Sequence, residues 1–167
     1  MNHLDRATSA TLTGIYPGIG FNDFSHITAA IRTEVYLACE KLYQAGYRTF
    51  LCTLDSDYDL LAADRVILFR EVKTPSVRLV AVLSHAHPPK RFGPAAIAKY
   101  MELCRDADEV VTLSRIRLSG ITRNAFFLKH SSHILYMDDG VSCPPDSLIA
   151  EAGKRGVPVT NLFNSIK

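Results

Sequence analysis

The chain has 167 residues, of which 47% are hydrophobic and 22% are charged, and this predicts a single globular domain over residues 1–167. Its formal net charge of +2 comes from nearly balanced acids and bases without a clustered stripe of Lys and Arg, so nothing supports nucleic-acid binding. No stretch approaches the roughly 18 apolar residues that a membrane span needs, so we expect no contact with a membrane.

Short apolar runs alternate along the chain with longer stretches of helical period. Residues 8–13 form the first run and predict a strand, and residues 24–45 predict a helix. The apolar residues that share one face of this helix are Ile27, Ile31, Val35, Ala38 and Leu42. The later runs predict, in chain order, strand 48–53, helix 58–73, strand 77–84, helix 95–104, strand 109–113, helix 121–130, strand 134–137, helix 147–154 and strand 158–162.

Six strands separated by helices indicate an α/β fold, a three-layer sandwich with a mostly parallel sheet of about six strands. Residues 77–84, VRLVAVLS, are nearly all apolar, which is typical of a strand buried on both faces of a parallel sheet. We therefore expect Phe50, Leu79, Val80 and Val111 to be buried. Leu79 and Val80 should face opposite sides of the sheet, because neighbouring strand residues alternate.

The four cysteines are widely spaced and fit no CxxC metal pattern. They are Cys39, Cys52, Cys104 and Cys143, and three of them lie in apolar runs. This distribution favours reduced, buried thiols and no disulfide. The N-terminus has no basic segment followed by an apolar one, so we expect a cytoplasmic protein.

In parallel sheets, ligands bind beyond the carboxyl ends of the strands. The loops in question begin at Gly14, Thr53, Ser84, Ser114 and Asp138. The first loop, TLTGIYPGIGF, matches neither GxGxxG nor the P-loop, and a turn explains Pro17 and Gly18 without a ligand. Gly14 is the stronger candidate, because it follows the strand directly and its missing side chain lets a ligand approach the backbone.

The second loop, TLDSDYD, carries three aspartates. It is not an EF-hand, because Leu60 and Val66 stand where the calcium loop needs Gly and Glu. We expect Asp57 to cap the following helix, whose unpaired N–H groups favour a carboxylate. Asp59 has two open interpretations, a metal or ribose ligand and a purely structural residue.

The third loop contains SHAHPPKRF, in which His85 and His87 have a spacing that can chelate zinc. No third ligand is evident, so we predict no metal site, and no cofactor is indicated. His130 and His133 are expected to face solvent or to form hydrogen bonds.

Six fragments resemble, in order and spacing, the YpsA-like branch of the SLOG superfamily, a Rossmann-like group that also contains DprA and the LOG phosphoribohydrolases. The fragments are LTG with the nearby proline, AGYRTFLCTLDSDYDLLAADRV, VRLVAVLSHAHPPKRF, KYMELCRDADEVVTLS, RNAFFLKHSSHILYMDDG and AGKRGVPVTNL. The resemblance covers almost the entire chain. It implies a Rossmann-like fold and a pocket for a nucleotide or nucleotide derivative.

The resemblance implies ligand-binding roles for residues that match the family's motifs: Gly14, Asp59, Arg123, Asn124, Asp139 and Gly140. Arg123 and Asn124 match an Arg-Asn pair, although a helix cap and a solvent-exposed arginine would explain them as well. The family's Gly-Gly-Thr loop corresponds to Cys143, Pro144 and Pro145. A proline offers no N–H to a phosphate, so we expect weak or absent binding of ordinary mononucleotides.

Three functions remain open from these residues. The first is a SLOG-type sensor or regulator that binds a nucleotide-derived small ligand. The second is hydrolysis of a nucleotide or N-glycoside, with Asp59 as acid/base and Arg123 as electrostatic stabiliser. The third is a binding-deficient family member that acts through protein contacts as a homodimer. The LOG reaction itself is disfavoured, because the PGGxGTxxE signature is absent and Glu151 lies out of register with it.

Overall fold

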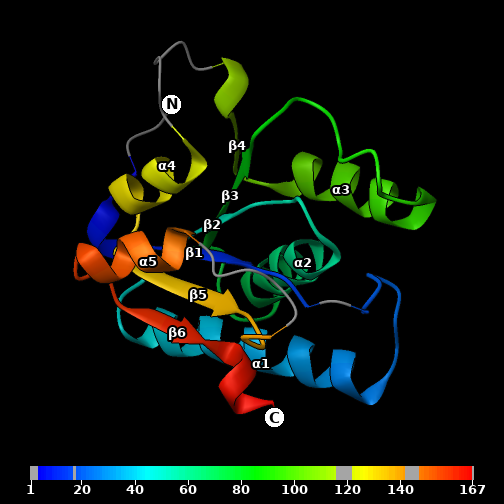
Figure 1. Cartoon of the computed structure of the whole chain (residues 1–167), viewed down its shortest axis with the longest axis horizontal. Helices are drawn as coiled ribbons and strands as arrows, with labels where there is room; N and C mark the ends of the chain where they lie inside the picture. The colour runs from blue at the N-terminus through cyan, green and yellow to red at the C-terminus, as the bar shows by residue number, and fades with distance from the viewer. Residues whose placement is uncertain (1–3, 17, 116–121, 142–146, 167) are drawn as a thin grey trace.

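The computed structural model describes residues 4–16, 18–115, 122–141 and 147–166. Its sheet has six strands in the order β4-β3-β2-β1-β5-β6, and every neighbouring pair is parallel (Figure 1). The strands are β1 (Ser9–Gly14), β2 (Thr49–Cys52), β3 (Arg78–Leu83), β4 (Glu109–Thr112), β5 (His133–Met137) and β6 (Val159–Asn161). The helices are α1 (His26–Gln44), α2 (Asp57–Val72), α3 (Pro94–Asp106), α4 (Arg123–His130) and α5 (Ser147–Lys154). This arrangement is a Rossmann-like α/β fold and confirms the predicted fold class.

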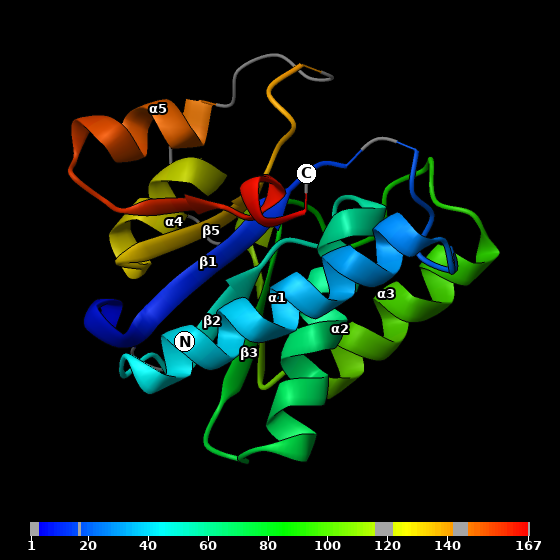
Figure 2. The same cartoon turned by 90° about the horizontal axis from the view of Figure 1, so that it is seen from below.

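The helices cover both faces of the sheet and make three layers, as Figure 2 shows from below. Helices α1, α2 and α3 pack on one face, and α4 and α5 pack on the other. Leu79 belongs to the first core and Val80 to the second, so the two side chains do face opposite sides of the sheet. Phe50 and Val111 are buried as expected.

The buried face of α1 differs from the predicted one. Its buried residues are Thr28, Ile31, Val35, Cys39 and Leu42. The prediction was wrong at Ile27, which is 39% exposed, and Ala38 is only half-buried. The helix begins at His26, where the Ser25 side chain accepts a hydrogen bond from the Thr28 N–H. Thr28 can lie inward because its hydroxyl donates a hydrogen bond of 2.8 Å to the Asp23 carboxylate, and Ile27 lies on the solvent side.

The described cysteines are all free thiols. Cys39 and Cys52 are buried, and Cys104 is half-buried. Burial raises the pKa of Cys39 to about 12, which keeps this thiol protonated. Cys143 lies outside the described residues. Within the described ranges, no helix combines the length and the apolar character that a membrane crossing requires.

The chain order reverses at the middle of the sheet. Strands β2, β3 and β4 are added in turn on one side of β1, and the chain then returns so that β5 pairs with β1 on its other side. This is the topological switch point, where open α/β sheets form their ligand crevice at the carboxyl ends of the strands. Gly14 is the last residue of β1, and Asp139 and Gly140 follow the end of β5, so these predicted site residues lie at the carboxyl ends of the two strands that flank this point.

Gly14 is the last residue of β1, and its neighbour across the sheet is Met137 of β5. Its φ is +150°, and a Cβ added here would lie 2.5 Å from the Met137 carbonyl oxygen. No side chain fits in that gap without moving one of the two strands. The contact between β1 and β5 therefore requires a glycine at this position, whether or not a ligand approaches it.

We predict that Gly14→Ala destabilises the protein by about 2 kcal/mol or more, because the new methyl group overlaps the β5 backbone. The matched control is Gly20→Ala, since an added Cβ there meets no described atom within 4 Å. The control should change the free energy of unfolding by less than about 0.5 kcal/mol. Urea unfolding followed by circular dichroism measures both, and equal midpoints for the two variants would contradict the packing argument.

Candidate functional site

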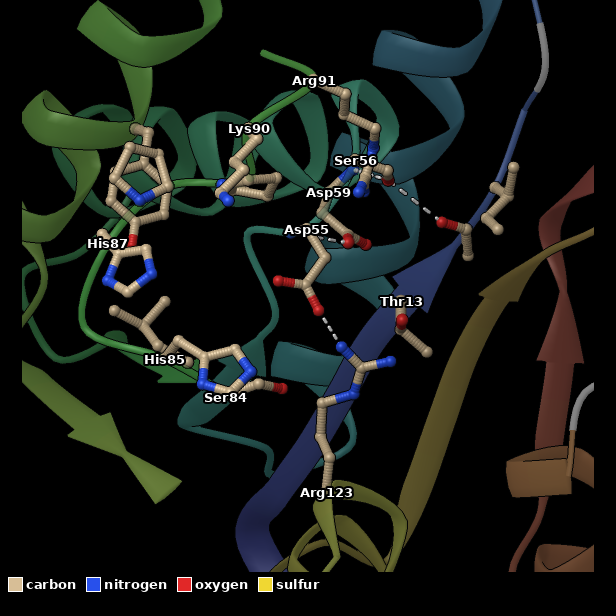
Figure 3. Close-up of a pocket in the computed structure, with 16 residues that line it drawn as sticks. Thr13, Asp55, Ser56, Asp59, Ser84, His85, His87, Lys90, Arg91 and Arg123 are labelled. Atoms are coloured by element: carbon tan, nitrogen blue, oxygen red, sulfur yellow. Dashed lines mark hydrogen bonds and ion pairs between the residues drawn. The ribbon is translucent and has the colours of Figure 1, made fainter. Parts of the chain in front are cut away.

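A cavity of about 510 Å³ opens at the carboxyl edge of the sheet (Figure 3). Its walls come from the ends of β1 and β3, the β2–α2 loop, the first turn of α2, the β3–α3 loop, α3 and the first residue of α4. This volume lies within the range of roughly 300–1,000 Å³ that small-molecule sites occupy. The cavity is therefore large enough to hold a ligand of nucleotide size.

Asp59 is the buried acid of this cavity, and only 3% of its surface is exposed. Its Oδ2 accepts a hydrogen bond of 3.2 Å from the Asp55 N–H, while its buried Oδ1 has no hydrogen-bond partner among the described residues. Burial raises the pKa of Asp59 to about 7. At neutral pH this carboxyl group therefore exchanges a proton readily and can act as a donor or an acceptor.

The residue that caps α2 is Ser56, and the prediction of Asp57 was wrong. The Ser56 hydroxyl oxygen accepts a hydrogen bond of 3.1 Å from the Asp59 N–H. The same hydroxyl donates a bond of 3.3 Å to the Gly14 carbonyl, which ties the start of α2 to the end of β1. Asp57 is the first residue of α2, and its Oδ1 accepts a bond from the Phe21 N–H.

Arg123 reaches the cavity from the first position of α4. Its guanidinium Nη1 forms an ion pair with the Asp55 carboxylate, and Figure 3 shows the side chain extending toward it. Both side chains are about one-third exposed, at 36% and 34%. The Thr122 hydroxyl caps α4 by accepting from the Ala125 N–H. Arg123 therefore does not point into bulk solvent, and it links α4 to the β2–α2 loop.

The other predicted site residues do not line this cavity. The Asn124 amide donates a hydrogen bond of 2.7 Å to the Ser147 hydroxyl of α5. The Asp139 carboxylate accepts from the Val141 N–H, and the Gly140 N–H donates to the Asp138 carboxylate. The structure thus brings Gly14, Asp59 and Arg123 together and holds the remaining three elsewhere. Pro17, Cys143, Pro144 and Pro145 lie outside the described residues.

The β3–α3 loop adds polar residues that the sequence had not assigned to a binding site. They are Ser84, His85, His87, Lys90 and Arg91. Lys90 and Arg91 have no carboxylate partner within the part of the chain that the structure describes. Their position just after a buried parallel strand is the signal that could have found them.

The two loop histidines lie side by side, with ring centroids 6.1 Å apart and planes 18° from parallel. No group of three or more His, Cys, Asp or Glu that could hold a metal ion occurs among the described residues. The cavity instead combines three cationic side chains with two carboxyl groups, one of which holds its proton up to about neutral pH. This balance favours an anionic ligand.

A scan against models of protein families finds none that matches the chain, and a search of curated proteins finds no significant match.

We predict that Asp59 makes stability fall as pH rises. The folded protein keeps a proton on Asp59 up to about pH 7, whereas the unfolded chain loses it near 3.8. This contribution is complete below pH 4 and is lost as pH rises through 7, by about 4 kcal/mol in total. Asp59→Asn stays neutral, so the variant should match the parent at pH 4 and exceed it in stability at pH 8.

Urea unfolding at pH 4, 6 and 8 measures this difference. Asp106→Asn is the control, because Asp106 pairs at the surface with Arg105, which is 73% exposed. The control should cost less than about 1 kcal/mol at every pH. Parallel pH profiles for the parent and Asp59→Asn would show that burial does not perturb this carboxyl group.

Proposed function

We propose that this protein is a sensor or regulatory domain of SLOG type that binds a nucleotide-derived small ligand in the cavity beside Asp59. The observation that carries the proposal is that Gly14, Asp59 and Arg123 meet at one cavity. The three lie far apart in the sequence, and each matches a motif of the family that the sequence resembles. The fold alone does not support this function, because Rossmann-like folds serve many functions.

The charges of the cavity suit a ligand with phosphate groups. Lys90, Arg91 and Arg123 offer N–H donors to phosphate oxygens, and arginine can do so in a bidentate manner. The first turn of α2 also borders the cavity and adds the positive end of a helix dipole. These donors lie on elements other than the 143–145 loop, so they would serve where Pro144 and Pro145 offer no N–H.

The carboxyl groups suit the sugar of such a ligand. The Asp59 Oδ1 has no hydrogen-bond partner among the described residues. The Asp59 carboxyl group can donate a hydrogen bond to a hydroxyl when it is protonated and accept one when it is ionised. A ribose hydroxyl near α2 would give this buried oxygen the hydrogen bond that it lacks. A ligand with both phosphate and ribose therefore uses both halves of the cavity.

ADP-ribose is the probe that tests this function, because it carries two phosphates and two riboses. We expect the protein to bind it, and Arg123→Gln to weaken the binding at least tenfold, since a charged hydrogen bond contributes about 1.5–3 kcal/mol. Arg105→Gln is the control, because Arg105 lies on α3 and pairs with Asp106. Calorimetry measures all three proteins. Absence of binding by the parent protein would overturn the proposal and favour the binding-deficient alternative.

A second candidate is N-glycoside hydrolysis, which the pKa of Asp59 near 7 favours. Water would attack the anomeric carbon, the C–N bond would break, and protonated Asp59 would donate its proton to the leaving base. The proton released by the water would then return to the Asp59 carboxylate. Arg123 would stabilise the charge on the sugar phosphate.

Release of free adenine from AMP at millimolar concentration, followed by chromatography, tests this reaction. We expect Asp59→Asn to abolish the release, because an amide cannot donate the proton. Equal release by the parent and Asp59→Asn, or no release by the parent, would exclude the hydrolase.

A further inference from the structure

We infer that a second cavity, next to the first, binds an aromatic ring of the same ligand, whose phosphates occupy the larger cavity. The inference rests on the proposed function and assigns the two parts of the ligand to two places. The smaller cavity has a volume of about 270 Å³. Ile15, Ser56 and Arg91 line both cavities, so the two spaces meet at these side chains.

Aromatic and aliphatic side chains make up much of the smaller cavity. Tyr16 and Ile19 come from the loop after β1, Tyr58 from α2, and Phe92 from the loop before α3. Ile19 and Phe92 are each only 8% exposed, and Tyr58 is 1% exposed. Flat apolar groups bind well on such surfaces, because aromatic side chains stack on rings and exclude water.

The aromatic wall is held in place by neighbouring rings. Tyr16 packs against Phe163, with ring centroids 6.2 Å apart. Phe92 makes an edge-to-face contact with Tyr100, at 6.5 Å between centroids. Tyr100 in turn lines the larger cavity. The wall therefore continues from one cavity to the other and needs little rearrangement to receive a ring.

Ile15 marks the junction of the two cavities. It is 48% exposed, which leaves a large apolar side chain in water at the point where the two spaces meet. A ligand that spans the junction would cover this side chain and remove its apolar surface from water. Arg91 lies at the same junction, where its guanidinium can bind a phosphate that is linked to the ring.

Charge decides which part of the ligand enters which cavity. Asp57 lines the smaller cavity, and Arg91 is the only cationic residue that lines it in the described chain. Lys90 and Arg123 line only the larger cavity and not the smaller one. The larger cavity therefore attracts phosphates more strongly than the smaller one, where the single cation is balanced by Asp57. A volume just under the roughly 300 Å³ at which whole-ligand pockets begin also suits a ring better than a complete nucleotide.

The test compares ADP-ribose with ribose 5-phosphate, which has a sugar and a phosphate but no ring. Calorimetry on the parent protein should show ADP-ribose binding at least tenfold more tightly. Tyr16→Ala should weaken ADP-ribose binding about tenfold and leave ribose 5-phosphate unchanged, because only the first ligand has a ring to stack. Tyr47→Ala is the control, since Tyr47 is also half-buried but lies before β2, outside both cavities.

Ala96→Leu provides a second variant that keeps the aromatic wall. Ala96 lines only the smaller cavity, so a larger side chain there should narrow it and selectively weaken ADP-ribose. Thermal unfolding verifies that each variant is folded. The inference is overturned, while the proposed function stands, if ADP-ribose binds the parent protein and both variants weaken the binding of the two ligands equally. The same holds if ADP-ribose binds and neither variant changes the binding of either ligand. If ADP-ribose does not bind the parent protein, both are overturned.

Discussion

Strand β1 lies inside the sheet, where its backbone hydrogen-bonds to β2 on one side and to β5 on the other. Its close contact with β5 at Met137 fixes the point where the strand ends and its loop begins. The Gly14 carbonyl accepts a hydrogen bond from the Ser56 hydroxyl, so the start of α2 is positioned relative to the same strand end. Asp55 and Asp59 follow from that position, and so does the cavity between them and the β3–α3 loop.

The order of strands and helices was predictable because burial leaves a clear pattern in the sequence. Residues 78–83 form a strand with apolar side chains on both faces, and such a run occurs only where helices cover the sheet on both sides. The inward face of α1 was less predictable, since a shift of one residue exchanges Ile27 for Thr28 and the periodicity fits both. The Thr28 hydroxyl can be buried because the Asp23 carboxylate accepts its hydrogen bond, a contact that periodicity does not show.

The site was predictable only in part. Gly14, Asp59 and Arg123 could be selected because each lies near a strand end or in a matching motif. Lys90 and Arg91 follow no periodic pattern, as exposed loop residues, and only the position of their loop after a buried parallel strand indicates them. The direction of the Asn124 side chain depends on how α4 packs beside α5, where the Ser147 hydroxyl accepts a hydrogen bond from the Asn124 amide. That contact joins positions 23 residues apart, and no local signal encodes it.

Asp59 and Asp55 show how two neighbouring carboxyl groups come to differ. Asp59 is almost completely buried, so desolvation raises its pKa to about 7 and keeps the group neutral below that pH. Asp55 is one-third exposed and is paired with Arg123. Because Asp59 is largely uncharged below pH 7, Arg123 and Asp55 interact there with little interference from a third charge. As pH rises above 7, the second carboxylate adds negative charge to the same small volume.

The ion pair between Asp55 and Arg123 also acts as an internal competitor. Any anion that contacts Arg123 through the same N–H groups must first displace a carboxylate tethered beside it, at a high effective concentration. The free energy needed to separate the pair is subtracted from the binding free energy, so the occupancy of the cavity rises only at higher ligand concentration. The tethered carboxylate also replaces a departing ligand at once, which favours rapid release. An ion pair of this kind therefore moves the midpoint of anion binding at Arg123 to a higher concentration than an unpaired arginine would give.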